Sequence, residues 1–331
     1  MRRLLLTTIA LLFVGVIKMY AQQEPQFTHY MFDKLAYNPA AAGINPEYVN
    51  ITGLYHNQWG SFHDAEGGSA PITQSAEIDG AIRSKFMSYK NMYIGAGLSF
   101  LNDREGFIST TGFMLAGDLH ISPSFGGDLS LGLNLGMINK SISPNWKDPN
   151  PTDPFLPGTS SNYGFDAGLG AYYSTIKYFI GISALHLPAT NLNWATPYNG
   201  APTSLATMTV DRTYFLTGGY YYDIPSNPDL QLQPSFLIKQ DAATTSFGIS
   251  CLLMWKQLAW AGINYRTEKV TALAVMAGIN LTPNLKIGAS YDVATSEPTA
   301  FGGTYEFFFN YRFKIKIPTE EPVWDRSPRF L

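Results

Sequence analysis

The chain has 331 residues, of which 14% are charged and 14% are aromatic, and its formal net charge is -3. An average soluble domain has about 25% charged residues, so charge is scarce on the surface of this protein. A small negative net charge without a basic block excludes a nucleic-acid surface, because phosphates are neutralised by clustered Lys and Arg. After the N-terminus no apolar run approaches the roughly 20 residues of a membrane-spanning helix, which excludes helical spans.

Residues 1–21 have the pattern of a cleavable export signal. Arg2 and Arg3 precede an apolar stretch over residues 4–17, and Met19-Tyr20-Ala21 is the candidate cleavage site. With one cysteine, Cys251, the chain has no internal disulfide, and no cysteine follows the apolar stretch to carry a lipid anchor. The pattern predicts export with removal of a signal peptide.

Residues 22–48 contain aromatic side chains without a regular alternation, and we predict no strand there. From residue 49 onward the hydrophobic pattern has a period of two, which predicts β-strands. In 128–139, for example, apolar side chains from Leu129 to Met137 alternate with small or polar ones. Fourteen strands are predicted, over 49–60, 72–83, 91–102, 108–121, 128–139, 163–174, 177–186, 211–224, 230–240, 244–256, 258–267, 269–281, 284–294 and 302–316.

The predicted strands have the length of membrane-crossing strands. A tilted strand needs about 9–11 residues to cross a bilayer, whereas strands of soluble proteins average about 5–6. Long connections over 61–71, 140–162 and 187–210 mostly alternate with very short ones at 175–176, 257 and 282–283. These features predict an all-β, transmembrane, antiparallel up-and-down β-barrel of about 14 strands over 49–316, in the outer membrane, with both termini in the periplasm.

The last predicted strand has the most specific pattern. Its aromatic face consists of Tyr305, Phe307, Phe309, Tyr311 and Phe313, as expected for a terminal strand that meets lipid. Glu306 and Arg312 lie on the other face, which requires a hydrated or well-paired lumen. Prolines at 318, 322 and 328 disfavour a further strand, so residues 317–331 are predicted to form a periplasmic tail.

Short motifs in order along the chain resemble the PorP/SprF family of outer-membrane proteins associated with type IX secretion. The motifs are residues 26–32 (QFTHYMF), 38–43 (NPAAAG), Gln58-Trp59, 70–73 (APIT), 163–170 (YGFDAGLG), His186-Leu187, 212–216 (RTYFL), Pro234-Ser235, Tyr265-Arg266 and 311–313 (YRF). The chain departs from the family's Gly-Ala-Pro turn at Ser69. The family-motif positions expected to serve docking or structure are Phe27, Tyr30, Phe32, Asn38, Pro39, Gly43, Gln58 and Trp59.

The resemblance implies a component of the type IX secretion and gliding machinery of the Bacteroidetes, which assists export or surface attachment of a cognate secreted protein. Its partners would be that secreted surface protein, periplasmic and outer-membrane components of the system, and outer-membrane lipid. The loops 140–162 and 187–210 are expected to contact the exported partner. The N-terminal segment and the tail are expected to meet periplasmic components.

Several alternatives stay open. Residues 22–48 are either a plug at the periplasmic mouth or a docking segment for periplasmic proteins. The alternating Gly, Ser and Ala of many strands suit either an open lumen, as in a passive porin or small-molecule transporter, or a closely packed plug. An outer-membrane enzyme is a further rival, with Asp118 and His120 on one strand face, although a polar lumen pair is favoured. The scattered histidines predict no metal site, and no cofactor is expected.

Overall fold

The computed structural model describes residues 24–60, 70–83, 91–123, 126–143, 159–198, 201–242, 244–267, 271–295 and 302–315. The predicted signal peptide and tail, and most of the loops 61–71 and 140–162, lie outside these residues. The short α2 (Lys34–Tyr37) and the 3-10 helix η1 (Pro39–Ala41) precede the strands. Over the described residues, no helix has the length and apolar character needed to span a membrane.

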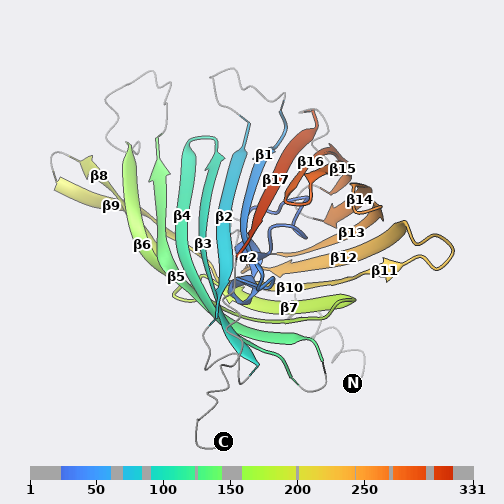
Figure 1. Cartoon of the computed structure of the whole chain (residues 1–331). Helices are drawn as coiled ribbons and strands as arrows, with labels where there is room; N and C mark the ends of the chain where they lie inside the picture. The colour runs from blue at the N-terminus through green and yellow to red at the C-terminus, as the bar shows by residue number, and fades with distance from the viewer. Residues whose placement is uncertain are drawn as a thin grey trace, which may run out of the picture.

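Fourteen strands form one closed antiparallel barrel (Figure 1). They are β1 (Tyr48–Asn57), β2 (Ile72–Ile82), β3 (Met92–Glu105), β4 (Ile108–Ile121), β5 (Asp128–Ile142), β6 (Ser160–Ser174), β7 (Tyr178–Leu185), β10 (Thr213–Tyr220), β12 (Leu230–Gln240), β13 (Thr245–Trp255), β14 (Ala259–Thr267), β15 (Ala272–Thr282), β16 (Leu285–Ala294) and β17 (Thr304–Lys314). Each pairs with its neighbour in the chain, and β1 closes the ring by pairing with β17. The short β11 (Tyr222–Asp223) extends the edge of β12 past β10. The predicted fold class and all fourteen predicted strands are confirmed.

The two ends of the barrel differ in their connections. We call the end where Tyr48 pairs with Lys314 the turn end. Residues 175–177, 256–258 and 283–284 connect strands there, as the sequence predicts. The opposite end, called the loop end, carries the long connections 58–71, 143–159 and 186–212, although residues 106–107 form a short turn at the same end. The alternation of short and long connections is therefore real but not strict.

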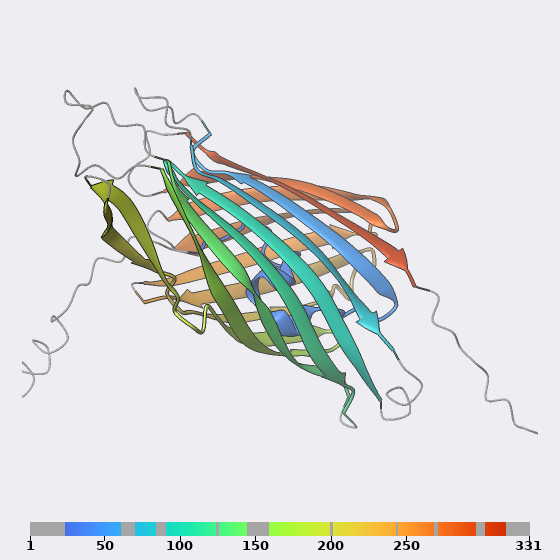
Figure 2. The ribbon, with the colours of Figure 1, turned by 90° about the vertical axis from the view of Figure 1, so that its left-hand side faces the viewer.

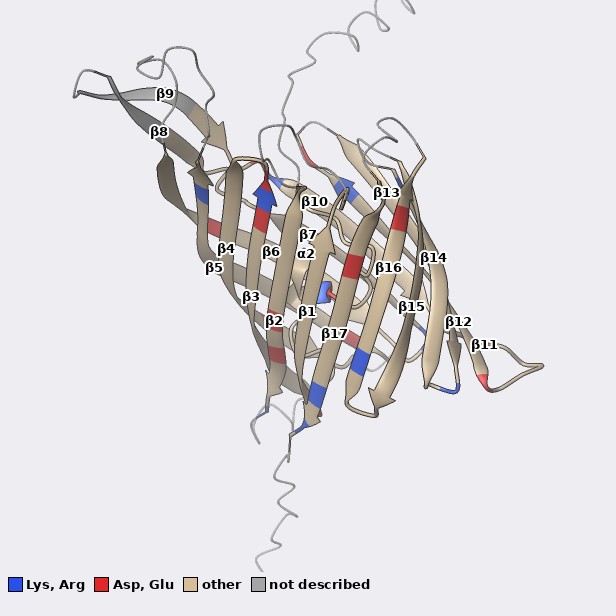
Figure 3. Cartoon of the chain, turned by 90° about the horizontal axis from the view of Figure 1, so that it is seen from above, with Lys and Arg blue, Asp and Glu red and all other residues tan. Residues whose placement is uncertain are grey.

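The outer wall is apolar, whereas the inner wall carries the buried polar side chains together with an apolar cluster. On β5 the residues Leu129, Leu131, Leu133, Leu135 and Met137 are exposed on the outside, while Ser130 and Asn134 are buried on the inside. The aromatic face of β17, from Tyr305 to Phe313, is likewise exposed, and Glu306 is buried. Charged residues are sparse along the strands (Figure 3). A closed ring with an apolar outer wall leaves no unpaired edge in lipid.

One element of the predicted loop 187–210 is regular. The strands β8 (Asn191–Tyr198) and β9 (Ala201–Thr209) form a separate antiparallel hairpin that projects beyond the barrel wall (Figure 2). Its base packs on the loop end, where Leu192 and Val210 form a buried cluster with Ile138. The sequence shows no apolar alternation strong enough to predict it.

The lipid-facing wall yields the first test. Leu135 lies midway along β5 and is 48% exposed on the outer wall. We expect Leu135→Arg to lower the free energy of unfolding in lipid by about 2–4 kcal/mol, because an Arg near the bilayer midplane faces hydrocarbon. Phe107→Arg, in the 106–107 turn at the loop end, is the control and should cost about 0–1 kcal/mol. Equal costs for both variants, measured by urea unfolding in lipid vesicles, would show that this wall does not face lipid.

Candidate functional site

Residues 24–46, called here the inner segment, run through the lumen of the barrel (Figure 2). The segment enters near the loop end, where the Glu24 carboxylate lies 2.8 Å from His186. It leaves near the turn end, where the backbone N–H of Gly43 donates to Asp79 of β2 at 2.8 Å. Between these points α2 and η1 turn the chain against the inner faces of the strands. The inner segment therefore connects the two ends of the barrel.

The carboxylate of Glu306 is the main attachment point near the loop end. It is fully buried on β17, and the backbone N–H groups of Thr28 and His29 donate to its two oxygens at 2.9 and 2.7 Å. The imidazoles of His29 and His56 contact the same oxygens at 2.6 and 2.8 Å. A buried carboxylate with four partners is a satisfied charge, whereas the same group in an empty apolar lumen would be very costly.

A second buried network joins the inner segment to β14 and β16. The guanidinium of Arg266 lies 2.9 Å from Asp292 and donates to the carbonyl of Gln26 at 2.7 Å. The hydroxyl of Thr28 donates to the carboxylate of Asp292 at 2.7 Å. The charged side chains of the wall therefore form hydrogen bonds with each other and with the inner segment.

Glu24 and His186 form the outermost attachment. Burial works against the charged form of the Glu24 carboxyl, but His186 outweighs it and lowers the pKa of Glu24 to about 2. Burial likewise works against the His186 imidazolium, yet the carboxylates of Glu24 and Asp166 raise the pKa of His186 to about 10. His186 lies 2.7 Å from Asp166. Both partners thus stay charged at neutral pH.

Aromatic side chains of the inner segment fill the middle of the lumen. Phe32 stacks on Phe308 with ring centroids 4.7 Å apart and packs against Trp260 at 5.1 Å. His29 stacks on Phe308 at 5.6 Å, and Phe27 meets His56 edge to face at 6.1 Å. Such pairs contribute about 0.5–1.5 kcal/mol each beyond the burial of their area.

Glycines of the inner wall make room for residues 38–42. A Cβ atom built on Gly132 would lie 2.6 Å from Ala40, and one on Gly95 would lie 2.1 Å from the carbonyl oxygen of Ala42. A Cβ on Gly170 would lie 2.0 Å from the side-chain oxygen of Asn38. The sequence left open whether the small inner residues create a pore or receive a plug. In the structure they receive the inner segment.

Hydrogen bonds fix residues 38–42 against this glycine floor. The Asn38 amide donates to the carbonyls of Ala171 and Ile182 at 3.0 and 3.3 Å, and its oxygen caps η1. The hydroxyl of Ser130 donates to the carbonyl of Ala40 at 2.6 Å. These bonds use backbone carbonyls of β6 and β7 as well as side chains of β5.

Asp118 and His120 do share one strand face, as predicted, and both are buried on the inner wall. The Nε2 atom of His120 lies 3.2 Å from Asp118 and 2.8 Å from the carbonyl oxygen of Ala42, and Nδ1 lies 2.6 Å from Asp128. The pair therefore holds the end of the inner segment. Within the described ranges, no group of three His, Cys, Asp or Glu residues is placed to hold a metal ion.

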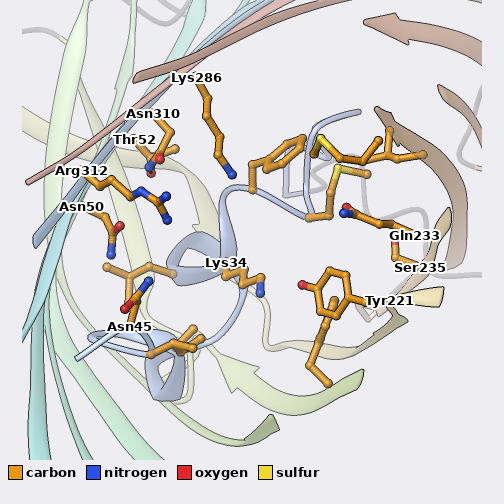
Figure 4. A pocket seen from close by; sticks show the side chains of 18 of the residues that line it. Lys34, Asn45, Asn50, Thr52, Tyr221, Gln233, Ser235, Lys286, Asn310 and Arg312 are labelled. Carbon is orange, nitrogen blue, oxygen red and sulfur yellow. The ribbon is translucent and has the colours of Figure 1, made fainter. Parts of the chain in front are cut away.

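Two cavities lie on opposite sides of the inner segment. The loop-end cavity, of about 300 Å³, is lined by Glu24, His56, Trp59, Asp103 and Arg266 among others. The turn-end cavity, of about 530 Å³, is lined by Lys34, Asn50, Glu77, Lys286 and Arg312 among others (Figure 4). The inner segment contributes residues to both cavities and lies between them.

Most family-motif positions fall in this lumen. Phe27, Tyr30, Asn38, Pro39 and Gly43 are buried, and Phe32 is half-buried. Gln58 and Trp59 lie in the connection after β1 and line the loop-end cavity. The sequence did not single out Glu24 or Asp292, because each is an isolated charge whose partner is distant in the chain, and it marked Arg266 only as part of the Tyr265-Arg266 family motif. A place on the inner face of a predicted strand was the available signal, and it pointed to Glu306 and Arg312 and to the pair Asp118 and His120.

These features define an outer-membrane β-barrel whose lumen holds its own N-terminal segment. Residues 19–311 match the family described as type IX secretion system membrane protein PorP/SprF. The chain belongs to this family.

Solved outer-membrane proteins resemble this chain to different degrees, and the comparison with TbuX supports the barrel fold. The toluene transporter TbuX of Ralstonia pickettii is 9% identical, with a TM-score of 0.51 over 84% of this chain and 92% of that chain. The toluene transporter TodX of P. putida is 9% identical, with a TM-score of 0.47 and the same coverage of 84% and 92%. Omp33 of Acinetobacter baumannii is 10% identical, with a TM-score of 0.43 over 81% and 98% of the chains. No curated protein sequence matches this chain.

The attachment of the inner segment can be tested at Glu306. We expect Glu306→Gln to lower the free energy of unfolding by about 1.5–3 kcal/mol, because it removes the carboxylate that accepts hydrogen bonds from the backbone of Thr28 and His29. Glu47→Gln is the control, since Glu47 meets Lys314 in a well-exposed pair at 3.4 Å, and it should cost at most about 1 kcal/mol. Urea unfolding in detergent micelles measures both variants. A Glu306→Gln protein as stable as the control would contradict the assigned role.

Proposed function

We propose that this PorP/SprF protein serves type IX secretion as a closed binding scaffold. It assists export or surface attachment of a cognate secreted protein, which it contacts at the loop end, and meets periplasmic components at the turn end. The observation that carries the proposal is the lumen filled by the inner segment. Family membership supports a role in type IX secretion, and the filled lumen supports a role as a binding scaffold and not as a pore.

The filled lumen disfavours the porin alternative. A passive pore needs a continuous hydrated path, whereas here buried ion pairs and stacked rings cross the middle of the barrel. The toluene transporter TbuX is only 9% identical to this chain, so the similarity indicates a shared barrel fold and does not indicate a shared substrate. The function is therefore proposed to be binding, without catalysis or passive transport.

The proposed orientation places the turn end in the periplasm and the loop end outside the cell. Short turns at one end and long connections at the other are typical of outer-membrane barrels, whose short turns are periplasmic. In this orientation the β8–β9 hairpin projects from the cell surface, where a secreted protein is met. The buried family-motif residues of the inner segment act in the scaffold itself and not as direct contacts of a periplasmic partner.

The hairpin offers a direct test of partner binding. Leu192 pairs with Met208, so residues 193–207 can be replaced by Asn-Gly, a pair that suits a two-residue hairpin turn. We expect this variant to fold into the membrane and to lose most of the large surface protein that co-purifies with the unaltered barrel after mild detergent extraction. The control is the same Asn-Gly replacement of residues 225–229 at the turn end, between the opposed Ile224 and Leu230, which should keep the surface protein. If both variants recover equal amounts of the surface protein, the hairpin is not part of the proposed interface.

Conductance separates a closed scaffold from a porin. We expect the purified chain to give no steady conductance in planar bilayers. Removal of residues 24–46 should open the lumen, and the point variant Arg266→Gln, which keeps the segment but loses the contact with Asp292, should give transient openings. A steady open pore from the unaltered chain would contradict the proposal in favour of transport.

A further inference from the structure

Three cations line the turn-end cavity, and two of them form no ion pair within the described part of the chain. Lys286 and Arg312 extend into it from the wall, and Lys34 extends from the inner segment (Figure 4). Across the described ranges, neither Lys286 nor Arg312 forms an ion pair with a carboxylate. Three cations that face one cavity repel one another, and an anionic group bound between them would relieve that repulsion.

The wall cations are built into adjoining strands. In the strand register Lys286 of β16 lies opposite Asn310 of β17, and Arg312 of β17 lies opposite Asn50 of β1. Asn310 also lies opposite Thr52 and donates to its hydroxyl at 3.0 Å. The register therefore places two cations and three polar side chains on one patch of the inner wall.

Ring faces hold the three cations without cancelling their charge. Arg312 lies 4.8 Å from the ring centroid of Tyr48, and Lys34 lies 4.4 Å from that of Phe179. Lys286 lies 5.9 Å from the ring of Phe32. A ring face stabilises a cation and leaves its N–H donors available. Arg312 uses Nε to donate to the carbonyl of Pro283 at 3.1 Å, which leaves the terminal guanidinium nitrogens for a ligand.

The acidic side chains of the cavity, Glu77 and Asp79, face groups other than Lys286 and Arg312. Asp79 accepts hydrogen bonds from the backbone of Gly43 at 2.8 Å and from the Asn50 amide at 3.2 Å. Glu77 lies near the fully buried Asp33 of the inner segment, where burial raises the pKa of Asp33. Neither acid is therefore arranged to neutralise Lys286 or Arg312.

We propose that the turn-end cavity is a binding site for a carboxylate-rich peptide segment of a partner protein. The inference rests on the proposed function for the side of the membrane that the cavity faces. Carboxylates match the guanidinium of Arg312 in planar, bidentate fashion and the ammonium of Lys286 as a point charge. The peptide's own amides find partners in the carboxamides of Asn45 and Gln233.

The position of the cavity favours a peptide over lipid. The strands separate the cavity from the bilayer, so a headgroup would have to leave the membrane plane to reach Lys286. A volume of about 530 Å³ is within the range of about 300–1,000 Å³ that is usual for ligand sites and is larger than a single phosphate needs. Apolar side chains, among them Leu252 and Met254, line part of the cavity and suit the carbon stems of a peptide.

The test measures binding of a fluorescein-labelled hexaglutamate peptide to the purified full chain in a neutral detergent, by fluorescence anisotropy. We expect binding that weakens as salt rises from about 50 to about 300 mM. The double variant Lys286→Gln/Arg312→Gln should bind at least about tenfold more weakly. Lys177→Gln is the matched control, because Lys177 is exposed in the 175–177 connection at the same end and does not line the cavity, and its affinity should be unchanged.

A second variant and other ligands test the proposal if the double variant folds poorly. Arg312→Lys keeps the charge and loses the planar donors, so it should bind with intermediate affinity. Equal peptide affinity in the double variant and the control, equal binding of hexalysine, or equally tight binding of inorganic phosphate would overturn the proposal. Displacement of the peptide by phosphatidylglycerol vesicles, but not by phosphatidylcholine vesicles, would assign the site to lipid instead. Because purified protein is used, a negative result leaves the secretion function standing, and that function fails separately if no surface protein co-purifies.

Discussion

Buried charge on the inner wall is the constraint on which the rest of this structure depends. The outer wall must be apolar where it lies in lipid, so the polar side chains in the middle of the strands point inward. Glu306, Asp292 and Arg266 consequently meet in a lumen that is closed to bulk water at its middle. Charges in such a place need partners, and the inner segment provides them through its backbone N–H and carbonyl groups as well as its side chains.

The barrel itself could be predicted from the sequence because its rules are local. A period of two, a length that crosses a bilayer and a turn at each end identify a strand without knowledge of its neighbours. The β17 strand shows this well, since the aromatic residues from Tyr305 to Phe313 alternate with Glu306 and Arg312 within eleven residues. Antiparallel pairing in chain order then leaves one closed arrangement, with β1 against β17.

The lumen could not be predicted because its interactions join residues far apart in the chain. His29 and Glu306 are 277 positions apart, and nothing in either local sequence indicates the contact. The inner segment has few regular elements, so its aromatic residues show no period from which a buried face could be inferred. The glycines at 95, 132 and 170 were visible as small residues, but only the three-dimensional register shows that residues 38–42 occupy the space they leave. The β8–β9 hairpin escaped prediction for a different reason, because its strands show no clear apolar alternation.

The energetics make the inner segment part of the folded state and not a removable lid. A folded domain is stable by about 5–15 kcal/mol in total, and leaving one member of a buried charged pair without its partner costs about 3–5 kcal/mol. Withdrawal of the segment would strip Glu306 of His29 and of two backbone donors, and Asp292 of the Thr28 hydroxyl. It would also separate Phe32 from Phe308 and leave the glycine floor of β3, β5 and β6 uncovered. Water that entered the lumen would offset part of this cost by solvating the charges, but it could not replace the packing of the rings. The closed barrel is therefore the ground state, and a partner that opened it would have to supply several kcal/mol of its own binding free energy.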